Sequence, residues 1–137
     1  MPISTSIDES RDLTIFTVKG ELTFQEEMET LKAFYSGEPT ANVLWDFRLL
    51  EGERISLQEL EAVSDFIKTN QSKRPQGKTA LVVANELDYG LSRASMTLYE
   101  IRNVSLSLMS FRSMDEALKW IDGEIVWDKT TYSFSKA

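Results

Sequence analysis

Short runs rich in β-branched and aromatic residues alternate along the chain with longer stretches in which apolar residues recur every three or four positions. The first two runs, Ile3–Asp8 and Leu13–Val18, are separated by the polar cluster Glu9–Asp12, which suits a turn. We therefore expect the chain to begin with an antiparallel β-hairpin.

Four stretches have the spacing of amphipathic helices, and each begins at a residue that can cap a helix. In three of them a Ser or Thr stands three residues before a Glu, which is the pattern of a capping box. The predicted caps are Thr23, Ser56, Asn85 and Ser113. The apolar stripes that we expect to face the core are Phe24, Met28, Leu31 and Phe34; Leu57, Leu60, Val63 and Ile67; Leu87, Leu91, Ala94, Leu98 and Ile101; and Met114, Ala117, Leu118 and Ile121.

Three strands are expected between the helices. Asn42–Phe47 and Lys78–Ala84 contain unbroken apolar runs, which are typical of parallel strands covered on both faces. Val104–Leu108 alternates apolar and polar residues, which places it at or near a sheet edge. The order β-β-α-β-α-β-α-β-α predicts an α/β fold whose mainly parallel sheet is built from successive β/α units, with an antiparallel first strand.

The segment Glu124–Ala137 falls outside this alternation and has the pattern of an extended arm. Two interpretations of the arm stay open: its apolar side chains pack on their own domain, or they dock on a second subunit of a homodimer. We expect one domain, residues 1–122, followed by an extended tail, residues 123–137. The apolar residues of the tail are Ile125, Trp127, Tyr132 and Phe134.

The composition excludes several classes of partner and of catalytic site. The chain has 137 residues, 22 acidic and 15 basic side chains, and a formal net charge of −7. Nucleic acids and anionic membrane surfaces call for a clustered positive field, so neither is an expected partner. The sequence contains no Cys and no His, which excludes a thiol nucleophile, an imidazole base and metal sites built on those ligands.

The sequence also lacks the usual motifs of enzyme chemistry. It has no Gly-rich phosphate loop and no Gly-x-Ser-x-Gly elbow, and no opposed pair of carboxylates can be nominated. The acidic run Glu26–Glu29 occupies the first turns of a predicted helix, where the dipole favours negative charge, so we interpret it as a solvated face. We expect no enzyme activity, no cofactor and no metal.

Targeting signals are not evident. Met1–Leu13 is polar and lacks the apolar run of a signal peptide. The longest aliphatic run, Ala80–Ala84, is far shorter than the ~20 residues of a membrane span. We expect a cytoplasmic protein.

Five local strings, each on the expected element, appear in a characteristic order: Gly20–Thr23, Leu44–Arg48, Gly77–Val82, Tyr89–Arg93 and Phe111–Ile121. Together they resemble the SpoIIAA-like superfamily, the fold shared by STAS domains, and particularly its small bacterial STAS/SEC14-like branch. The resemblance spans roughly residues 3–122 and leaves the tail unmatched.

The resemblance implies a cytoplasmic bacterial protein with no established catalytic activity. The wider family includes anti-sigma-factor antagonists that are switched by phosphorylation of a Ser between the third strand and the second helix. Here that connection lacks the family signature Asp-Ser-Ser-Gly, which argues against a switch of the same kind. Ser56 is the first Ser of the connection, and its predicted capping role already accounts for it.

The candidate binding site lies at the carboxyl ends of the strands, where open α/β sheets bind ligands. The connection Arg48–Ile55 is the longest in the chain, and its apolar residues among charges would suit a movable lid over a ligand or a partner segment. Beside it, a face of the third helix combines an aromatic ring, a cation and an adaptable Met. The candidate residues are Asp46, Arg48, Leu49, Leu50, Ile55, Ser56, Tyr89, Arg93 and Met96.

Several of these residues have a plain structural interpretation. Asp46 and Arg48 are either an ion pair that fixes the connection or a polar handle for a ligand. Ser56 is most simply a helix cap. The face with Tyr89 and Arg93 is either plain solvated surface or a surface that binds a partner or ligand. In the second case Arg48 or Arg93 would meet a carboxylate or phosphate end of the bound molecule.

Two functions therefore lead. The first is a non-catalytic STAS-like regulatory module that binds a protein partner in bacterial signalling. The second is a carrier or sensor of a small apolar, lipid-like ligand under the mobile connection. A partner-binding module predicts an exposed apolar patch, whereas a carrier predicts a lined cavity. An unrecognised enzyme is the remaining alternative.

Overall fold

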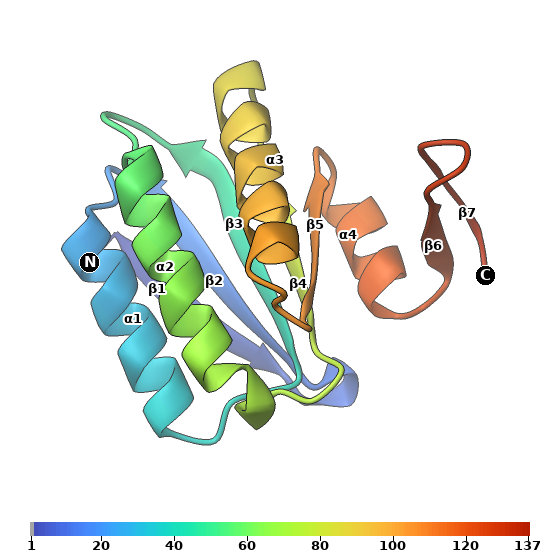
Figure 1. Ribbon diagram of the computed structural model, residues 1–137, viewed down its shortest axis with the longest axis horizontal. Coiled ribbons are helices and arrows are strands. Elements are labelled where there is room, and N and C mark those ends of the chain that lie inside the picture. The colour runs from blue at the N-terminus through green and yellow to red at the C-terminus, as the bar shows by residue number, and fades with distance from the viewer. Residues whose placement is uncertain (1) are drawn as a thin grey trace.

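The computed structural model describes residues 2–137, and strands and helices alternate along it as the sequence predicts (Figure 1). The strands are β1 (Ile3–Asp8), β2 (Leu13–Gly20), β3 (Asn42–Leu50), β4 (Lys78–Val82), β5 (Ser107–Phe111), β6 (Ile125–Asp128) and β7 (Ser133–Lys136). The helices are α1 (Phe24–Ser36), α2 (Leu57–Asn70), α3 (Glu86–Ile101) and α4 (Met114–Ile121), with short 3₁₀ turns at Glu9–Arg11 and Gln71–Lys73.

The first five strands form one sheet in the order β1-β2-β3-β4-β5. β1 is antiparallel to β2, and each later neighbour is parallel. The expected mainly parallel sheet, with β3 and β4 as adjacent strands and β5 at an edge, is confirmed. The ends of β3, β4 and β5 therefore meet the starts of α2, α3 and α4 at one side, at the top of Figure 1, which we name the carboxyl edge.

Helices cover the two faces of the sheet unequally, because α1, α2 and α3 pack on one face and α4 packs on the other. The larger core lies under the three helices and is centred on Phe16, Val18, Leu31, Trp45, Ile67 and Tyr99. The smaller core lies under α4 and is centred on Leu13, Leu44, Val82, Phe111, Ala117 and Trp120. Both faces of β3 and β4 are thus buried, as their unbroken apolar runs predict.

Helix caps form largely as the sequence predicts. Thr23 and Ser56 each close a complete capping box with the Glu three residues later. The Asn85 side chain accepts a hydrogen bond from the Asp88 N–H at 2.9 Å. At Ser113 only half of the expected box forms, because its hydroxyl accepts from the Glu116 N–H while no return bond is made.

Several strand boundaries differ from expectation. β2 ends at Gly20 rather than Val18, β4 at Val82 rather than Ala84, and β5 at Phe111 rather than Leu108. β3 continues to Leu50, because after a bulge opposite β2 its residues Leu49 and Leu50 pair with Lys19 and Gly20. The first three residues of the expected long connection, 48–50, are therefore strand. β5 begins at Ser107 rather than at residue 104, because residues 104–106 bond to α3 and to the turn after α2 instead of to β4.

The stripe predicted for α3 is partly wrong. Leu87 and Ile101 are exposed, and the buried residues of the helix are instead Asp88, Ser92 and Tyr99. The polar members can be buried because Asp88 pairs with a cation and Ser92 shares a 2.5 Å hydrogen bond with Ser110 of β5. In α2, Leu57 is likewise exposed rather than part of the core.

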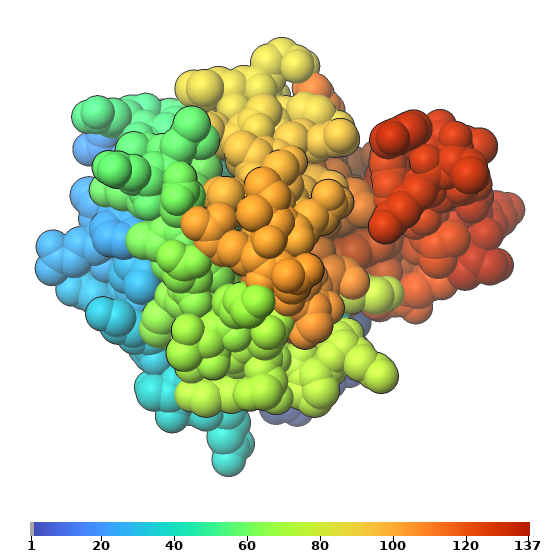
Figure 2. Space-filling model, in the orientation of Figure 1, coloured from blue at the N-terminus to red at the C-terminus, as the bar shows by residue number. Residues whose placement is uncertain are grey.

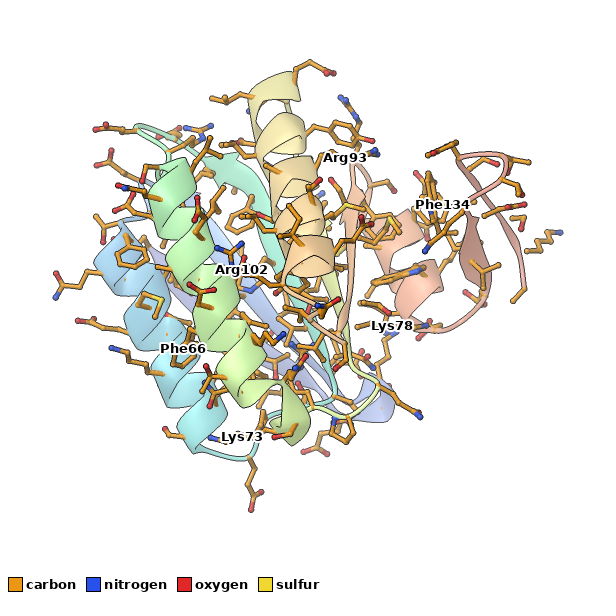
Figure 3. All side chains as sticks on the ribbon, in the orientation of Figure 1. Phe66, Lys73, Lys78, Arg93, Arg102 and Phe134 are labelled. Carbon is orange, nitrogen blue, oxygen red and sulfur yellow. The ribbon has the colours of Figure 1, made fainter. Side chains whose placement is uncertain are left out.

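The tail is a small hairpin, β6–β7, rather than a single extended arm. Figure 3 shows Phe134 on the side of the hairpin that faces the domain, and its ring stacks on Phe111 with 5.2 Å between centroids. Ile125 packs beside it on the smaller core. The hairpin therefore uses these two residues against its own domain and leaves Val126 and Tyr132 exposed.

Candidate functional site

The expected site residues lie at or near the carboxyl edge, but they form three separate groups. In Figure 2 the start of α2 and the start of α3 lie next to each other at the top of the molecule. The groups are the Asp46–Arg48 pair, the connection from β3 to α2, and the outer face of α3.

Asp46 and Arg48 form an ion pair within β3. Both guanidinium contacts to the carboxylate are 2.9 Å, and the Arg48 N–H adds a bond of 3.1 Å. Burial by itself would raise the pKa of Asp46, but the hydrogen bonds from Arg48 outweigh it and hold that pKa below its ordinary value. By strand alternation the pair lies on the α4 side of the sheet, so it fixes the end of β3 away from the larger core.

Only Glu51–Ile55 remains as the connection between β3 and α2, and several contacts hold it. Gly52 adopts a left-handed φ of 77°, and the next N–H, that of Glu53, bonds to the Glu21 carboxylate at 2.9 Å. Leu50 and Ile55 turn inward beneath this segment, whereas Leu49 is exposed. Ser56 serves as the N-cap of α2. The expected lid is thus shorter than predicted and tied at its centre.

The strongest tie is an ion pair between Arg54 and Asp88, which sequence reasoning missed. The guanidinium meets both carboxylate oxygens, at 2.7 and 3.0 Å, and joins the connection to the first turn of α3. The hydrogen bond to Asp88 raises the pKa of Arg54 above its ordinary value. The only signal for this pair in the sequence was Arg54 as the one cation of residues 51–55.

Tyr89, Arg93 and Met96 share the outer face of α3, as predicted. Arg112, at the end of β5, lies over the Tyr89 ring at 4.3 Å from its centroid, and Arg93 contacts the same ring from 5.9 Å. Figure 3 shows Arg93 near the carboxyl edge. This face differs from the one that meets Leu50 and Ile55, where α3 contributes Asp88, Leu91, Ser92 and Ser95.

Two adjoining gaps, neither of them fully enclosed, lie between the sheet and helices α1, α2 and α3. One, of about 90 Å³, extends towards the amino ends of the strands, and the other, of about 80 Å³, lies under Arg54 and Ile55. Five residues border both gaps: Glu27, Phe47, Leu60, Leu81 and Ser95. The gaps therefore adjoin at the middle of the larger core.

Glu27 corrects the interpretation of the acidic run in α1 as a wholly solvated face. Its side chain is buried, at 7% exposure, because α1 turns this residue towards the sheet one turn before Leu31. Burial, with a smaller effect from the charge of Glu59, raises the pKa of Glu27 to about 7. Pattern reasoning could not find it, since a Glu in the first turn of a helix is ordinarily explained by the dipole.

Other kinds of site find no support in the described part of the chain. Residues 2–137 contain no group of three or more acidic side chains placed to hold a metal ion. Within the same residues, no helix is both long and apolar enough to cross a membrane.

Comparison with known proteins identifies the fold. No family and no curated protein matches the chain at the level of sequence. Among solved structures it is similar to an uncharacterised protein of the DUF3478 family with a SpoIIAA-like fold from Shewanella loihica PV-4, at 19% identity and a TM-score of 0.55, over 87% of this chain and 93% of that one. It is also similar to an anti-sigma factor antagonist from Mycobacterium paratuberculosis, at 15% identity and a TM-score of 0.51, over 88% and 94%. The chain has the SpoIIAA-like fold that its local strings indicate.

Proposed function

We propose that the protein is a non-catalytic STAS-like regulatory module that acts in bacterial signalling by binding a protein partner at the carboxyl edge. The supporting observation is a set of exposed leucines, Leu49, Leu57 and Leu87, at 55%, 61% and 59% exposure. They stand at the end of β3 and in the first turns of α2 and α3. Large apolar side chains gathered at one edge of a domain are typical of an interaction surface.

The side chains around these leucines suit a protein partner. The Tyr89 ring contacts two arginines, and Tyr and Arg are over-represented among residues that carry binding energy in interfaces. Arg93 is exposed and can donate to a partner carboxylate, whereas the guanidinium of Arg48 is already paired with Asp46. The similar anti-sigma factor antagonist adds support by analogy of fold alone.

A pair of variants on one helix tests the proposal. A photo-crosslinker at position 87 captures the partner in cells, and calorimetry with the purified partner measures affinity. Leu87→Asp is expected to weaken binding about tenfold or more. Ile101→Asp is the matched control, because Ile101 is even more exposed, at 68%, and lies at the far end of α3. Equal affinities for the two variants, both folded by circular dichroism, would contradict the proposal.

A second candidate function is that of a carrier or sensor of a small apolar ligand. The observation that favours it is the pair of gaps beneath the connection from β3 to α2. Their volumes, about 90 and 80 Å³, suit a compact ligand, since pockets for drug-sized molecules run to ~300 Å³ and more. Native mass spectrometry of the purified protein checks for a bound molecule, and an unliganded mass under gentle conditions speaks against a tightly held one.

A cytoplasmic location and a homodimer through the tail are further parts of the proposal. Exposed Val126 and Tyr132 on the β6–β7 hairpin provide the apolar surface for such a contact. Light scattering on the full chain and on a chain lacking residues 124–137 measures the oligomeric state. A monomer in both cases removes the dimer from the proposal. A lower melting temperature of the shortened chain reports separately the loss of the Phe134–Phe111 stack.

A further inference from the structure

Two polar side chains that border the interior gaps find no partner in the rest of the described chain. The Glu27 carboxylate and the Tyr99 hydroxyl, 7% and 9% exposed as residues, make no hydrogen bond or ion pair with residues 2–137. Both border the 90 Å³ gap, from α1 and α3. No side-chain nitrogen or oxygen of residues 2–137 is both fully buried and without a hydrogen-bond partner, so the oxygens of these two groups stay accessible, and water or a ligand can bond to them.

Neighbouring polar groups of the gaps are satisfied in the ordinary way. The Ser64 hydroxyl donates to the Leu60 carbonyl at 3.0 Å, and the Ser95 hydroxyl donates to the Leu91 carbonyl at 3.2 Å. The buried cation Arg74 makes all its bonds to carbonyl and hydroxyl oxygens at the amino ends of the strands. Glu27 therefore differs from them as a carboxyl group, 7% exposed, without a cation or a hydrogen-bond donor among residues 2–137.

Aromatic rings surround the same gap. Its lining includes Phe16, Phe34, Tyr35, Trp45, Phe47 and Tyr99. Aromatic faces carry a negative quadrupole that attracts cations, and cages of such rings recognise alkylammonium groups. A carboxylate beside aromatic rings is an environment that favours a cation with an apolar body over a neutral or anionic molecule.

We propose that the adjoining gaps bind a compact organic amine in its ammonium form, with the charged head at the Glu27 carboxylate and the apolar body among the aromatic rings. The inference rests on the second candidate function, the carrier or sensor, and names its ligand class. The Tyr99 hydroxyl is the second contact of the head and accepts a hydrogen bond from it. Without the amine, burial and the charge of Glu59 raise the pKa of Glu27, which fits a carboxylate that lacks its counterion.

The size of the gaps limits the ligand to one ring or a short chain. A cavity of ~150 Å³ lined by apolar side chains binds benzene, and the two gaps are about 90 and 80 Å³. The competing occupant is ordered water, which a polar cavity of this size also holds. An experiment must therefore separate an amine from water and from a purely apolar molecule.

Three probes of one shape and three charges make this distinction. The full-length protein is titrated with benzylamine, benzyl alcohol or benzoate at neutral pH, and amide NMR shifts of gap residues such as Phe47 and Ser95 report binding. Benzylamine is expected to bind about tenfold or more tightly than benzyl alcohol, and benzoate is expected to leave these shifts unchanged.

Matched variants assign the effect to Glu27. Glu27→Gln is expected to reduce the affinity for benzylamine to that for benzyl alcohol. Glu29→Gln, on the exposed side of the same helix, removes the same charge and should change nothing. Tyr99→Phe, which keeps the ring, should weaken benzylamine binding a few-fold and stands in if Glu27→Gln does not fold.

Each remaining outcome overturns the inference in a distinguishable way. If benzyl alcohol binds as tightly as benzylamine, the gaps take apolar molecules without regard to charge, and only the second candidate function survives. If no probe shifts the gap residues, ordered water fills the gaps and the carrier function fails as well. If Glu27→Gln retains the preference for benzylamine, the charge is recognised elsewhere.

Discussion

Arg74 and Glu27 are both buried and charged, and both border the same interior gap, yet their surroundings are opposite. Arg74, at 2% exposure, donates to the Ala41 and Lys78 carbonyls and to the hydroxyls of Tyr35 and Thr79, over distances of 2.9–3.1 Å. Glu27 receives no hydrogen bond from the described residues.

This difference separates a structural charge from a free one. Arg74 joins the end of α1, the start of β3 and the start of β4. Its hydrogen bonds therefore hold the amino ends of the strands together. The carboxylate of Glu27 has its whole bonding capacity left, and a buried group of that kind either binds something or changes its protonation. Four variants test this contrast between the two groups.

Arg74→Met should have the largest effect. It retains much of the volume but leaves two carbonyls and two hydroxyls without their donor, at about 1–3 kcal/mol for each group that stays unsatisfied. We expect a loss of about 4 kcal/mol in the free energy of unfolding, measured by urea denaturation. Arg74→Lys, which keeps the charge and loses the planar fork, should recover only part of it. A loss below about 1 kcal/mol would show that Arg74 is not structural.

Glu27→Gln should act in the opposite direction and depend on pH. The pKa of the Glu27 carboxyl group is near its ordinary value of 4.5 in the unfolded state and about 7 in the folded state. Between these values the folded state binds more protons, so the stability of the wild type falls as pH rises through that window. The total fall is about 3 kcal/mol, from 1.36 kcal/mol for each pKa unit.

The Gln variant has no such titration. We therefore expect its stability relative to the wild type to grow from pH 4.5 to pH 7 and to stay constant above, in urea titrations at several pH values. Glu29→Gln again serves as the surface control. A difference that does not change with pH would mean that Glu27 titrates alike in the folded and unfolded states.

Arg54→Met tests the Arg54–Asp88 ion pair, whose environment is intermediate between those of Arg74 and Glu27. The variant leaves Asp88 buried without its cation, which costs several kcal/mol in a rigid interior. Arg54 lies in a short surface connection, where Asp88 can regain contact with water, so we expect about 2 kcal/mol. Hydrogen exchange should rise in residues 51–56 and not in β4. Unchanged exchange there would show that other contacts, such as that of Glu53 with Glu21, hold the connection.

Ser95→Ala should have the smallest effect, within about 0.5 kcal/mol. Ser95 borders both gaps, but its hydroxyl donates only to the carbonyl one turn earlier in α3. Its removal therefore leaves no other buried side chain without a hydrogen-bond partner. Thermal unfolding measures the change. A larger loss would show that the hydroxyl also binds the contents of the gaps.

Local signals account for what could be predicted. Thr23, Ser56 and Asn85 cap their helices because a cap involves atoms within one turn, and the unbroken run in β4 implies a buried parallel strand whichever elements cover it. At the site, the sequence places Leu50 and Ile55 near the carboxyl edge, but it pairs them with the wrong face of α3. Arg54, Asp88 and Glu27 were missed because each has a plausible local role on the surface.

The sequence by itself determined the order of the elements as far as α4, most of their starts and the mainly parallel sheet, since periodicity and capping depend on neighbours along the chain. Only the tertiary structure decided how far β3 extends, because Leu49 and Leu50 become strand by pairing with β2. It also decided which face of α3 is buried and that Glu27, alone in its acidic run, points inward. Burial depends on which elements pack together across the sheet, and a pattern within one helix does not contain that information.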